Sequence, residues 1–529
     1  MLQPVLIAGQ WRPAAASGAF QAENPATLES LPEQYPISDW ADCDAALAAA
    51  HEAYGQLRAA PVASLAAFLE DFAGRIEAQA GELVERAHQE TALAKSPRLA
   101  DVELPRTANQ LRAAAQAARD GSWRLPTIDS QSNIRSMFDS LGPVAVFGPN
   151  NFPLAFNSAS GGDFAAAIAA GNPVIAKANT SHPGTTRLLA QAAHEAARTA
   201  DLPAGTIQLL YRTSHEDGER LVADPRLGAT GYTGSRAAGL ALKRAADAAG
   251  KPIYLELSSV NPVVILPGGL DERGSAIADE FAASCLMGAG QFCTNPGLLL
   301  LLESTATSRF VKAISERFAA APTAALLSRR VRQSLATSVG ELTQAGAKVL
   351  CGGQEAAPGA RYANTLLTAP ASKFIERSEA LQTEAFGNAS LVVVARDVEE
   401  LLTAIECLEG NLTGCVYSAP SGADDAIYAR IEPALRAKVG RLLNDKMPTG
   451  VAVSPAMNHG GPYPATGHPG FTAVGIPAAL RRFARLNCYD NVRADRLPKE
   501  LRDKNPTGKL WRWIDGEWTT RHAVAPGRA

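Results

Sequence analysis

Residues 144–177 read VAVFGPNNFPLAFNSASGGDFAAAIAAGNPVIAK. The β-branched run at 144–148 predicts a strand that ends at a Gly-Pro-Asn-Asn turn. Small residues at 160–170 favour a helix, and 173–177 has the pattern of the next strand. A strand, a helix and a second strand in this order imply parallel pairing, because the helix carries the chain back along one face of the sheet. The stretch therefore predicts an α/β fold with a doubly wound parallel sheet.

The same alternation continues beyond this stretch. The expected elements are a helix at 183–200, a strand at 206–211, a helix at 215–223, a strand at 228–232 and a helix at 235–249. A second alternating region spans about 262–455, in which VVIL, LLLLLE and SLVVVA are expected to be buried strands between helices. We therefore expect two doubly wound parallel-sheet lobes that join at residues 255–262.

The remaining segments predict additional parts. Apolar residues recur at helical spacing between about 42 and 118, whereas 121–142 and 479–491 have a more polar, extended character. Asp515-Gly516, between WRWI and EWT, is a good signal for a two-residue hairpin. The expected boundaries are 1–122 with 143–258 for the first lobe, 259–458 for the second lobe, 123–142 and 476–495 for two extended arms, and 496–529 for a C-terminal tail.

The composition is that of a globular enzyme. With 529 residues, 46% hydrophobic and 19% charged, the chain is long enough for several lobes and is not expected to be disordered. A net charge of −3 without a basic block argues against nucleic acid or a membrane as a partner. Seven scattered cysteines without a C-x-x-C pair favour reduced thiols and argue against a metal site. The sequence begins without a signal-peptide pattern, so we expect the protein in the cytoplasm.

The string GAGQFCTNPG at 288–297 places Cys293 among turn-forming glycines. Backbone N–H groups in such a turn lower the pKa of a thiol and can hold a developing oxyanion, as a cysteine nucleophile requires. A buried structural cysteine is the ordinary alternative, but the other cysteines lack such a setting. Cys293 is therefore the candidate nucleophile.

The string YLELSSVNP at 254–262 places Glu256 among apolar residues at the end of a strand. Burial disfavours the charged form of a carboxyl group, so we expect the pKa of Glu256 to rise toward neutrality. Such a group suits general base catalysis near pH 7. An ion-paired carboxylate at the junction of the lobes is the structural alternative.

The string GPNNFPLAF at 148–156 ends the first strand in two amides. The side chain of Asn151 would supply an N–H₂ donor to an oxyanion. Asn150 and Asn151 are otherwise ordinary turn-forming residues.

Together these strings resemble motifs of the aldehyde dehydrogenase superfamily. NFPLAF, LELSSVNP and GQFCTNPG, in this order, are similar to its asparagine, glutamate and cysteine motifs. TEAFGNASLVVV at 383–394 is similar to its second glutamate motif, GYTGSRAAG at 231–239 to its phosphate-side motif, and VIAKANTSHPG at 174–184 to its ribose-lysine motif. The resemblance covers about 5–495 of the chain.

This resemblance implies a reaction and a role for each lobe. An aldehyde would be oxidised to the acid through a thiohemiacetal and a thioester on Cys293, with Asn151 holding the oxyanion and Glu256 activating the hydrolytic water. The first lobe would bind NAD(P), and the second would carry the nucleophile. The arms would pair with a neighbouring subunit in a homodimer, or alternatively a tetramer, because an open sheet edge is better covered than exposed.

The resemblance also implies a set of cofactor-binding residues. No G-x-G-x-x-G follows the first strand. The implied residues are Lys177, Thr180 and Arg212 near the adenosine ribose, Gly234, Ser235 and Gly239 near the pyrophosphate, and Glu384 with Phe386 near the nicotinamide ribose. NAD-preferring relatives often carry a glutamate where this chain has Thr180, and its absence relieves repulsion with a 2′-phosphate. We therefore expect NADP as the preferred cofactor, or NAD. A helix cap at Ser235, packing at Gly239 and a surface position for Arg212 are the structural alternatives.

The C-terminal region narrows the resemblance. HGGPYPATGHPGFTAVG at 459–475, followed by RRFARLNCYDN, is similar to a bacterial branch that includes α-ketoglutaric semialdehyde dehydrogenases and NADP-dependent fatty aldehyde dehydrogenases. The substrate is then a semialdehyde or an aliphatic aldehyde. A CoA-acylating relative is an alternative that Glu256 argues against, and a catalytically inactive nucleotide-binding relative is another. No histidine lies in a motif that suggests a Cys-His pair, which disfavours a cysteine hydrolase.

Overall fold

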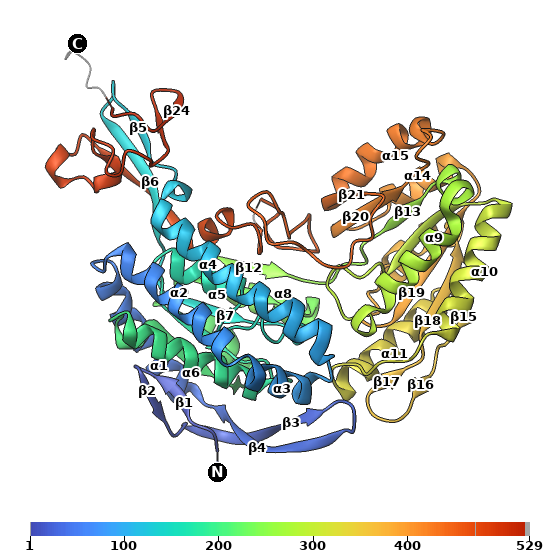
Figure 1. Ribbon diagram of the computed structural model, residues 1–529, viewed down its shortest axis with the longest axis horizontal. Coiled ribbons are helices and arrows are strands. Elements are labelled where there is room, and N and C mark those ends of the chain that lie inside the picture. Colours follow the sequence, from blue (N-terminus) through green and yellow to red (C-terminus); the bar gives the residue numbers. More distant parts are fainter. Residues whose placement is uncertain (1, 471, 524–529) are drawn as a thin grey trace.

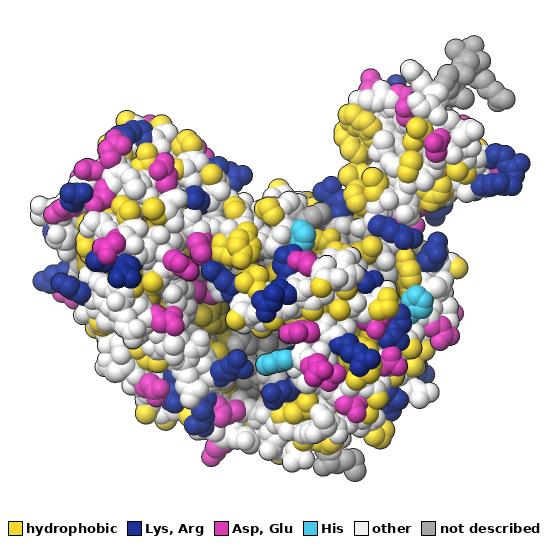
Figure 2. Space-filling view, turned by 180° about the vertical axis from the view of Figure 1, so that it is seen from behind, with side chains coloured by type: hydrophobic (Ala, Val, Ile, Leu, Met, Phe, Trp, Pro, Cys, Tyr) yellow, Lys and Arg dark blue, Asp and Glu magenta, His cyan; other side chains and the backbone are white. Residues whose placement is uncertain are grey.

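The computed structural model describes residues 2–470 and 472–523. In this part of the chain two α/β lobes face each other, and a strand-rich arm projects from the first lobe (Figure 1). The surface is hollowed between the lobes, and acidic and basic side chains are interspersed over the face shown in Figure 2. The fold class predicted from the alternation of strands and helices is confirmed.

The first lobe is built on a seven-stranded sheet with the order β12-β11-β7-β8-β9-β1-β2. Its strands are β12 (Ile253–Glu256), β11 (Ala229–Thr233), β7 (Val144–Phe147), β8 (Val174–Lys177), β9 (Ile207–Leu210), β1 (Val5–Ile7) and β2 (Gln10–Arg12). The five strands from β12 to β9 are parallel, and β1 and β2 add an antiparallel edge. The chain runs from β7 to β8 and β9 on one side and then crosses to β11 and β12. The winding direction therefore changes between β7 and β11.

Helices cover both faces of this sheet (Figure 1). They are α1 (Trp40–Leu57), α2 (Val62–Ala78), α3 (Ala80–Thr91), α4 (Leu104–Asp120), α5 (Gly162–Ala169), α6 (Pro183–Thr199), α7 (His215–Ala223) and α8 (Arg236–Ala248). The apolar residues of α2 recur every three or four positions, so one face of the helix is buried. Phe68 and Phe72 on that face pack against Phe164 of α5, with ring centroids 6.3 and 5.8 Å apart. These aromatic contacts fix α2 and α5 against each other.

The second lobe contains another seven-stranded sheet, with the order β15-β18-β19-β14-β13-β20-β21. Its strands are β15 (Lys348–Cys351), β18 (Thr365–Pro370), β19 (Ala389–Ala395), β14 (Leu298–Leu302), β13 (Val263–Ile265), β20 (Asn411–Tyr417) and β21 (Val439–Asn444). The helices are α9 (Pro267–Leu286), α10 (Thr305–Ala320), α11 (Arg329–Gln344), α12 (Ala371–Glu376), α13 (Ser378–Leu381), α14 (Val398–Glu406) and α15 (Asp425–Lys438). Only β15 is antiparallel to its neighbour in this sheet. The five leucines of β14 are all buried, as expected for a strand covered on both faces.

The arm is a five-stranded sheet with the order β22-β6-β5-β23-β24. Its strands are β22 (Ala484–Asp490), β6 (Ile134–Ser140), β5 (Thr127–Asp129), β23 (Arg512–Ile514) and β24 (Glu517–Thr519). The predicted hairpin is present, and both Asp515 and Gly516 have the positive φ that a tight two-residue turn requires. The strand expected from residue 479 begins only at Ala484, because 478–483 form a 3₁₀-helix.

Two smaller sheets complete the fold. The sequence did not predict the long hairpin of β3 (Ala16–Asn24) and β4 (Glu29–Ser38), to which β10 (Arg212–Thr213) adds in parallel. Most residues of β3 are exposed or half-buried, so the strand lacks a clear alternation of apolar and polar residues. A short hairpin of β16 (Glu355–Ala356) and β17 (Arg361–Tyr362) lies in the second lobe.

Candidate active site

Four of the residues predicted from sequence lie at the carboxyl ends of neighbouring strands in the first lobe. Asn151 follows β7 and Gly234 follows β11, whereas Lys177 and Glu256 are the last residues of β8 and β12. Ligands of open parallel sheets bind at this end, where the winding direction changes. The first lobe therefore presents these side chains along one sheet edge.

Cys293 approaches this edge from the second lobe. It lies in the loop between a short turn at Met287–Gly290 and strand β14. Gly290 has a positive φ, and an added Cβ there would overlap the backbone of Gly387, so the turn requires glycine. The side-chain amide of Asn261, at the end of the predicted LELSSVNP motif, donates to the Cys293 carbonyl at 2.9 Å. The junction of the lobes thus holds the cysteine loop directly.

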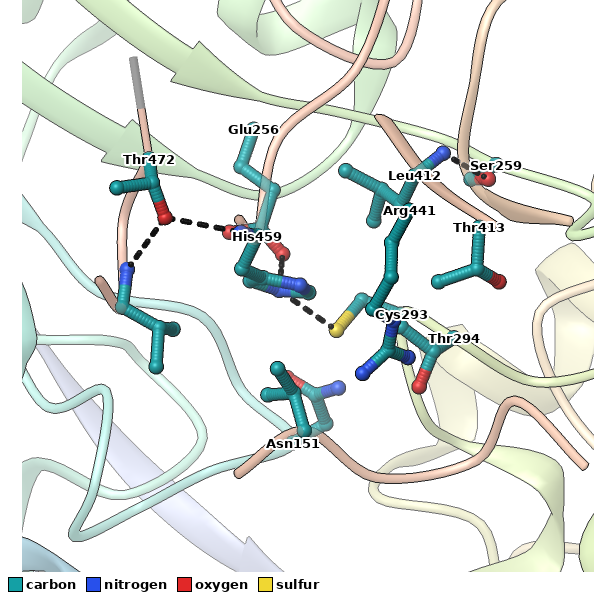
Figure 3. Close-up of polar contacts among 12 residues, drawn as sticks. Asn151, Glu256, Ser259, Cys293, Thr294, Leu412, Thr413, Arg441, His459 and Thr472 are labelled. Carbon is teal, nitrogen blue, oxygen red and sulfur yellow. Dashed lines mark hydrogen bonds and ion pairs between the residues drawn. The ribbon is translucent and has the colours of Figure 1, made fainter. Parts of the chain in front are cut away.

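A histidine that the sequence analysis missed connects Cys293 with Glu256 (Figure 3). His459 Nε2 lies 3.4 Å from Cys293 Sγ and 2.8 Å from Glu256 Oε1. His459 and Glu256 are only 2% and 5% exposed. The sequence contains no Cys-His motif, but this did not exclude a contact between the two side chains, because Cys293 and His459 are separated by 166 positions. The one sequence signal was that His459 opens the HGGPYPATGHPG motif.

Close backbone packing holds His459 in place. The segment that it opens lies against strand β21, where an added Cβ at Gly440 would overlap the backbone of Gly460. Farther along, Thr466 forms an isolated antiparallel bridge with Glu256 of β12. The segment therefore contacts strands of both lobes and carries the histidine between them.

The electrostatics of this cluster differ from the sequence-based expectations. Burial raises the pKa of the Cys293 thiol well above its ordinary value, and Glu256 raises it further, although Arg106 opposes the shift. The expected lowering by backbone N–H groups is not found. Burial also pushes the pKa of Glu256 upward, but the charge and hydrogen bond of His459 outweigh it, so the pKa of Glu256 is lowered. The expected rise of this pKa was wrong because the sequence did not show the partner.

Asn151 is buried in the loop that follows β7. Its Nδ2 donates to the Gln291 carbonyl at 3.0 Å, and its own carbonyl accepts from Arg98 Nη2 at 2.9 Å. An amide nitrogen has two hydrogens, so one of them is left for another acceptor. The buried carboxylate of Glu103 accepts from the backbone N–H groups of Leu154 and Ala155, which fixes the loop.

Lys177 and Arg212 lie close together at the end of β8. Burial lowers the pKa of Lys177 to about 8, and the charge of Arg212 contributes. Lys177 forms no ion pair with another described residue. Arg212 is exposed, and Thr180 is half-buried in the loop after β8. Two cations without a carboxylate partner suit an anionic ligand such as a phosphate.

The glycine-rich turn after β11 leads into helix α8. Gly234 N–H donates to the Glu256 carbonyl at 3.1 Å, so the turn is tied to the next strand. Ser235 occupies the N-cap position of α8, but its side chain forms no capping hydrogen bond. An added Cβ at Gly239 would lie 2.5 Å from the side chain of Leu257, so packing requires this glycine.

Glu384 and Phe386 line a cavity at the junction of the lobes, together with Ser259, Phe292 and Asn295. Burial raises the pKa of Glu384 to about 7, opposed by hydrogen bonds from Ser258 and Ser259. The cavity adjoins Cys293, because Phe292 precedes it in the chain. The structure thus brings Glu384 to the catalytic cluster, whereas Lys177, Thr180 and Arg212 lie around the carboxyl end of β8.

The cluster around Cys293 could also hold a metal ion. One ligand atom each from Glu256, Cys293 and His459 lies within 4.8 Å of the others. These residues are far apart in sequence, so the absence of a short ligand motif carried no information about such a cluster.

Within the residues that the structure covers, no helix is long and apolar enough to cross a membrane. All seven cysteines are free thiols.

The structure thus consists of two parallel-sheet lobes that meet at a half-buried cysteine. Residues 11–440 match the family model described as the aldehyde dehydrogenase family. The chain belongs to this family and is an NAD(P)-dependent aldehyde dehydrogenase that oxidises aldehydes to acids.

Two relatives agree with this assignment, and solved structures have a similar fold. The chain is 39% identical over 515 residues to α-ketoglutaric semialdehyde dehydrogenase 2 of Azospirillum brasilense, covering 95% of this chain and 97% of the relative. It is 36% identical over 523 residues to α-ketoglutaric semialdehyde dehydrogenase of Acinetobacter baylyi, covering 95% and 98%. The fold is similar to PnpE from Pseudomonas sp. WBC-3, with a TM-score of 0.79 and 22% identity over 93% of this chain and 98% of the other. A second PnpE structure, in complex with nicotinamide adenine dinucleotide, has a TM-score of 0.79 and 21% identity over 93% and 99%.

We expect Glu256→Gln to speed the alkylation of Cys293 by iodoacetamide at pH 8 several-fold. The variant removes a negative charge that raises the pKa of the thiol, so a larger fraction is thiolate at a given pH. The rate is measured by mass spectrometry of the peptide that contains Cys293, and alkylation of the exposed Cys488 in the same sample is the control. Slower or unchanged alkylation would show that Glu256 does not raise the pKa of the resting thiol.

Proposed function

We propose that Cys293 is the nucleophile of this enzyme, and that Asn151 and Glu256 complete its catalytic set. The observation that carries the proposal is the convergence of Cys293, His459 and Glu256, with contacts of 3.4 and 2.8 Å. The thiol proton passes to the His459–Glu256 pair as the sulfur attacks the carbonyl carbon and a C–S bond forms. The free hydrogen of the Asn151 amide donates to the oxyanion of the resulting thiohemiacetal.

The second half of the reaction returns the enzyme to its resting state. When bound, NAD(P)⁺ supplies the acceptor for the hydride that leaves the thiohemiacetal carbon. The remaining thioester is cleaved by water, and Glu256 accepts the proton of that water. The C–S bond breaks as the carboxylic acid leaves. One of the two protons held by the His459–Glu256 pair returns to the sulfur of Cys293, and the other is released to water, so the thiol and the pair are both restored. Because Glu256 is in place, we favour hydrolysis over transfer of the acyl group to CoA, and complete catalytic contacts argue against an inactive relative.

The cofactor is proposed to be NADP, or NAD. Lys177 and Arg212 would hold the phosphate or ribose of the adenosine, and Thr180 carries no charge that would repel a 2′-phosphate. Gly234, Ser235 and Gly239 would lie beside the pyrophosphate, whose charge is favoured at the N-terminus of α8. Glu384 and Phe386 would border the nicotinamide ribose.

The substrate is proposed to be a semialdehyde such as α-ketoglutaric semialdehyde, or an aliphatic aldehyde. The support is the identity of 39% and 36% to two proteins that are named for this semialdehyde.

We further propose that the first lobe, residues 1–122 with 143–258, binds the cofactor. The second lobe, residues 259–458, would carry the nucleophile. The enzyme is expected in the cytoplasm, without nucleic acid or a membrane as a partner.

The arms at 123–142 and 476–495 are proposed to join two subunits into a homodimer, with a tetramer as the alternative, and 496–529 are proposed to be a C-terminal tail. Strands β23 and β24 of this tail extend the arm sheet. β22 lies at the edge of the arm sheet and has no neighbour on one side within the described residues. Leu486 on this strand is 59% exposed, and hydrophobic side chains gather on the arm (Figure 2). An exposed apolar edge strand is a ready site for pairing with another chain.

Replacing Cys293 by Ala should abolish formation of the reduced cofactor with every aldehyde, because the variant lacks the thiol that is proposed to attack the carbonyl carbon. The assay follows reduced-cofactor absorbance over aldehydes of increasing length, with NAD and NADP in parallel. Cys407→Ser, in the second lobe, is the matched thiol control and should retain full activity. Residual turnover by the Ala variant would contradict the proposed mechanism.

Thr180→Glu should lower kcat/KM for NADP by about tenfold or more and leave NAD use unchanged or improved. The new carboxylate would face the 2′-phosphate, and like charges held close together cost several kcal/mol. Thr180→Gln has a similar size without the charge and should keep NADP activity. Equal losses with both cofactors would show that residue 180 does not lie near the 2′-position.

Leu486→Asp should convert the oligomer to a monomer, because it places a charge on the apolar edge of β22. Light scattering coupled to gel filtration measures the mass. Val349→Asp, on the exposed edge strand β15, is the control and should leave the mass unchanged. A monomeric and active wild-type protein would refute the proposed role of the arms.

A further inference from the structure

A guanidinium group near Cys293 has no role in the proposed catalytic set. Arg106 lies in the first turn of α4, with its guanidinium carbon 5.1 Å from the ring centroid of Phe156 and 5.9 Å from that of Phe152. These rings belong to a separate buried apolar cluster that also includes Phe292. The Phe156 ring also lies 6.0 Å from the ring of His459. The cluster and Arg106 therefore form a wall beside the reacting groups.

One edge of this guanidinium has no hydrogen-bond partner. Nη1 of Arg106 donates to the Val451 carbonyl at 2.8 Å. Nε and Nη2 are buried and without a partner among the described residues. Together they form the side of the guanidinium that matches the two oxygens of a carboxylate. A buried donor pair left unsatisfied is costly, so a ligand that accepts from both would be stabilised there.

Arg106 also forms no ion pair with another residue that the structure describes. Glu103, the acid closest along the same segment, pairs with Arg98 at 2.7 Å. Glu256 is engaged by His459. Burial lowers the pKa of Arg106, as expected for a cation removed from water without a counter-ion. An anionic group from outside the protein would offset this cost.

Arg441 is a second cation near Cys293, but its contacts indicate a structural role. Its side chain passes Cys293 toward Asn151 (Figure 3). Its Nη2 donates to the carbonyls of Pro448 and Gly450, at 3.0 and 3.2 Å, so it fastens that loop. Arg106 is therefore the better candidate for ligand binding.

We propose that Arg106 binds the distal carboxylate of the substrate through Nε and Nη2, and that the enzyme thereby selects short oxo acids over neutral aldehydes. The inference rests on the proposed function, since it takes Cys293 as the atom that the aldehyde end must reach. The aromatic rings of Phe152 and Phe156 would enclose the methylene chain between the two ends. Binding energy at the carboxylate would then orient the aldehyde toward the thiol.

The test compares matched substrates in matched variants. Arg106→Met should lower kcat/KM for 4-oxobutanoate by roughly 100-fold, the scale expected when charge-assisted hydrogen bonds are lost. With butanal, which has the same chain without the carboxylate, the loss should be several-fold at most, because the variant then removes only the effect of Arg106 on the pKa of the Cys293 thiol. Arg106→Lys should recover part of the activity with 4-oxobutanoate. Arg112→Met, on the same helix but paired at the surface with Glu77, is the control and should change neither rate.

A binding measurement separates this inference from the proposed function. In the Cys293→Ala background no thiohemiacetal can form, so calorimetry reports the affinity for 4-oxobutanoate alone. Adding Arg106→Met should remove this binding, and this outcome would support the carboxylate site even if turnover assays failed. Equal losses for 4-oxobutanoate and butanal would overturn the inference, because Arg106 would then act on the thiol rather than on the substrate. Unchanged kinetics for both substrates would overturn it as well.

Discussion

The active site depends on the close packing of one irregular segment against strands of both lobes. Where His459 begins this segment, glycines at 440 and 460 allow the backbones to approach more closely than any side chain would permit. A few residues later the segment bridges to Glu256 on β12. Neither lobe alone contains the cluster of Cys293, Glu256 and His459, because Cys293 comes from a loop of the second lobe, Glu256 from a strand of the first and His459 from the segment between them. The relative position of the lobes therefore sets the distances within this cluster.

This packing also explains the electrostatic state of the site. Removing a thiol and a carboxylate from water raises the pKa of both, but only the carboxylate has a partner that reverses the effect. Burial and the charge of Glu256 thus favour the neutral thiol of Cys293, whereas His459 favours the charged form of Glu256.

The sequence predicted those features that depend on local patterns. Strand and helix alternation located β7, α5 and β8 within a few residues, and the residues at strand ends followed from the topology of parallel sheets. It could not predict His459 or Arg106, because their significance arises from contacts across 166 and 345 positions of the chain. The pKa directions of Cys293 and Glu256 were wrong for the same reason, since each depends on a neighbour that no local motif reveals. β3 was missed because an exposed strand has no apolar periodicity to detect.

The arm sheet has a consequence for biosynthesis. β5 and β6 are made early, at residues 127–140, but the strands that flank them lie between 484 and 519. Domains generally fold as they leave the ribosome, from the N-terminal side onward. The early strands must therefore wait, with unpaired edges, until nearly the whole polypeptide has been synthesised. The arm sheet is therefore completed only at the end of chain synthesis.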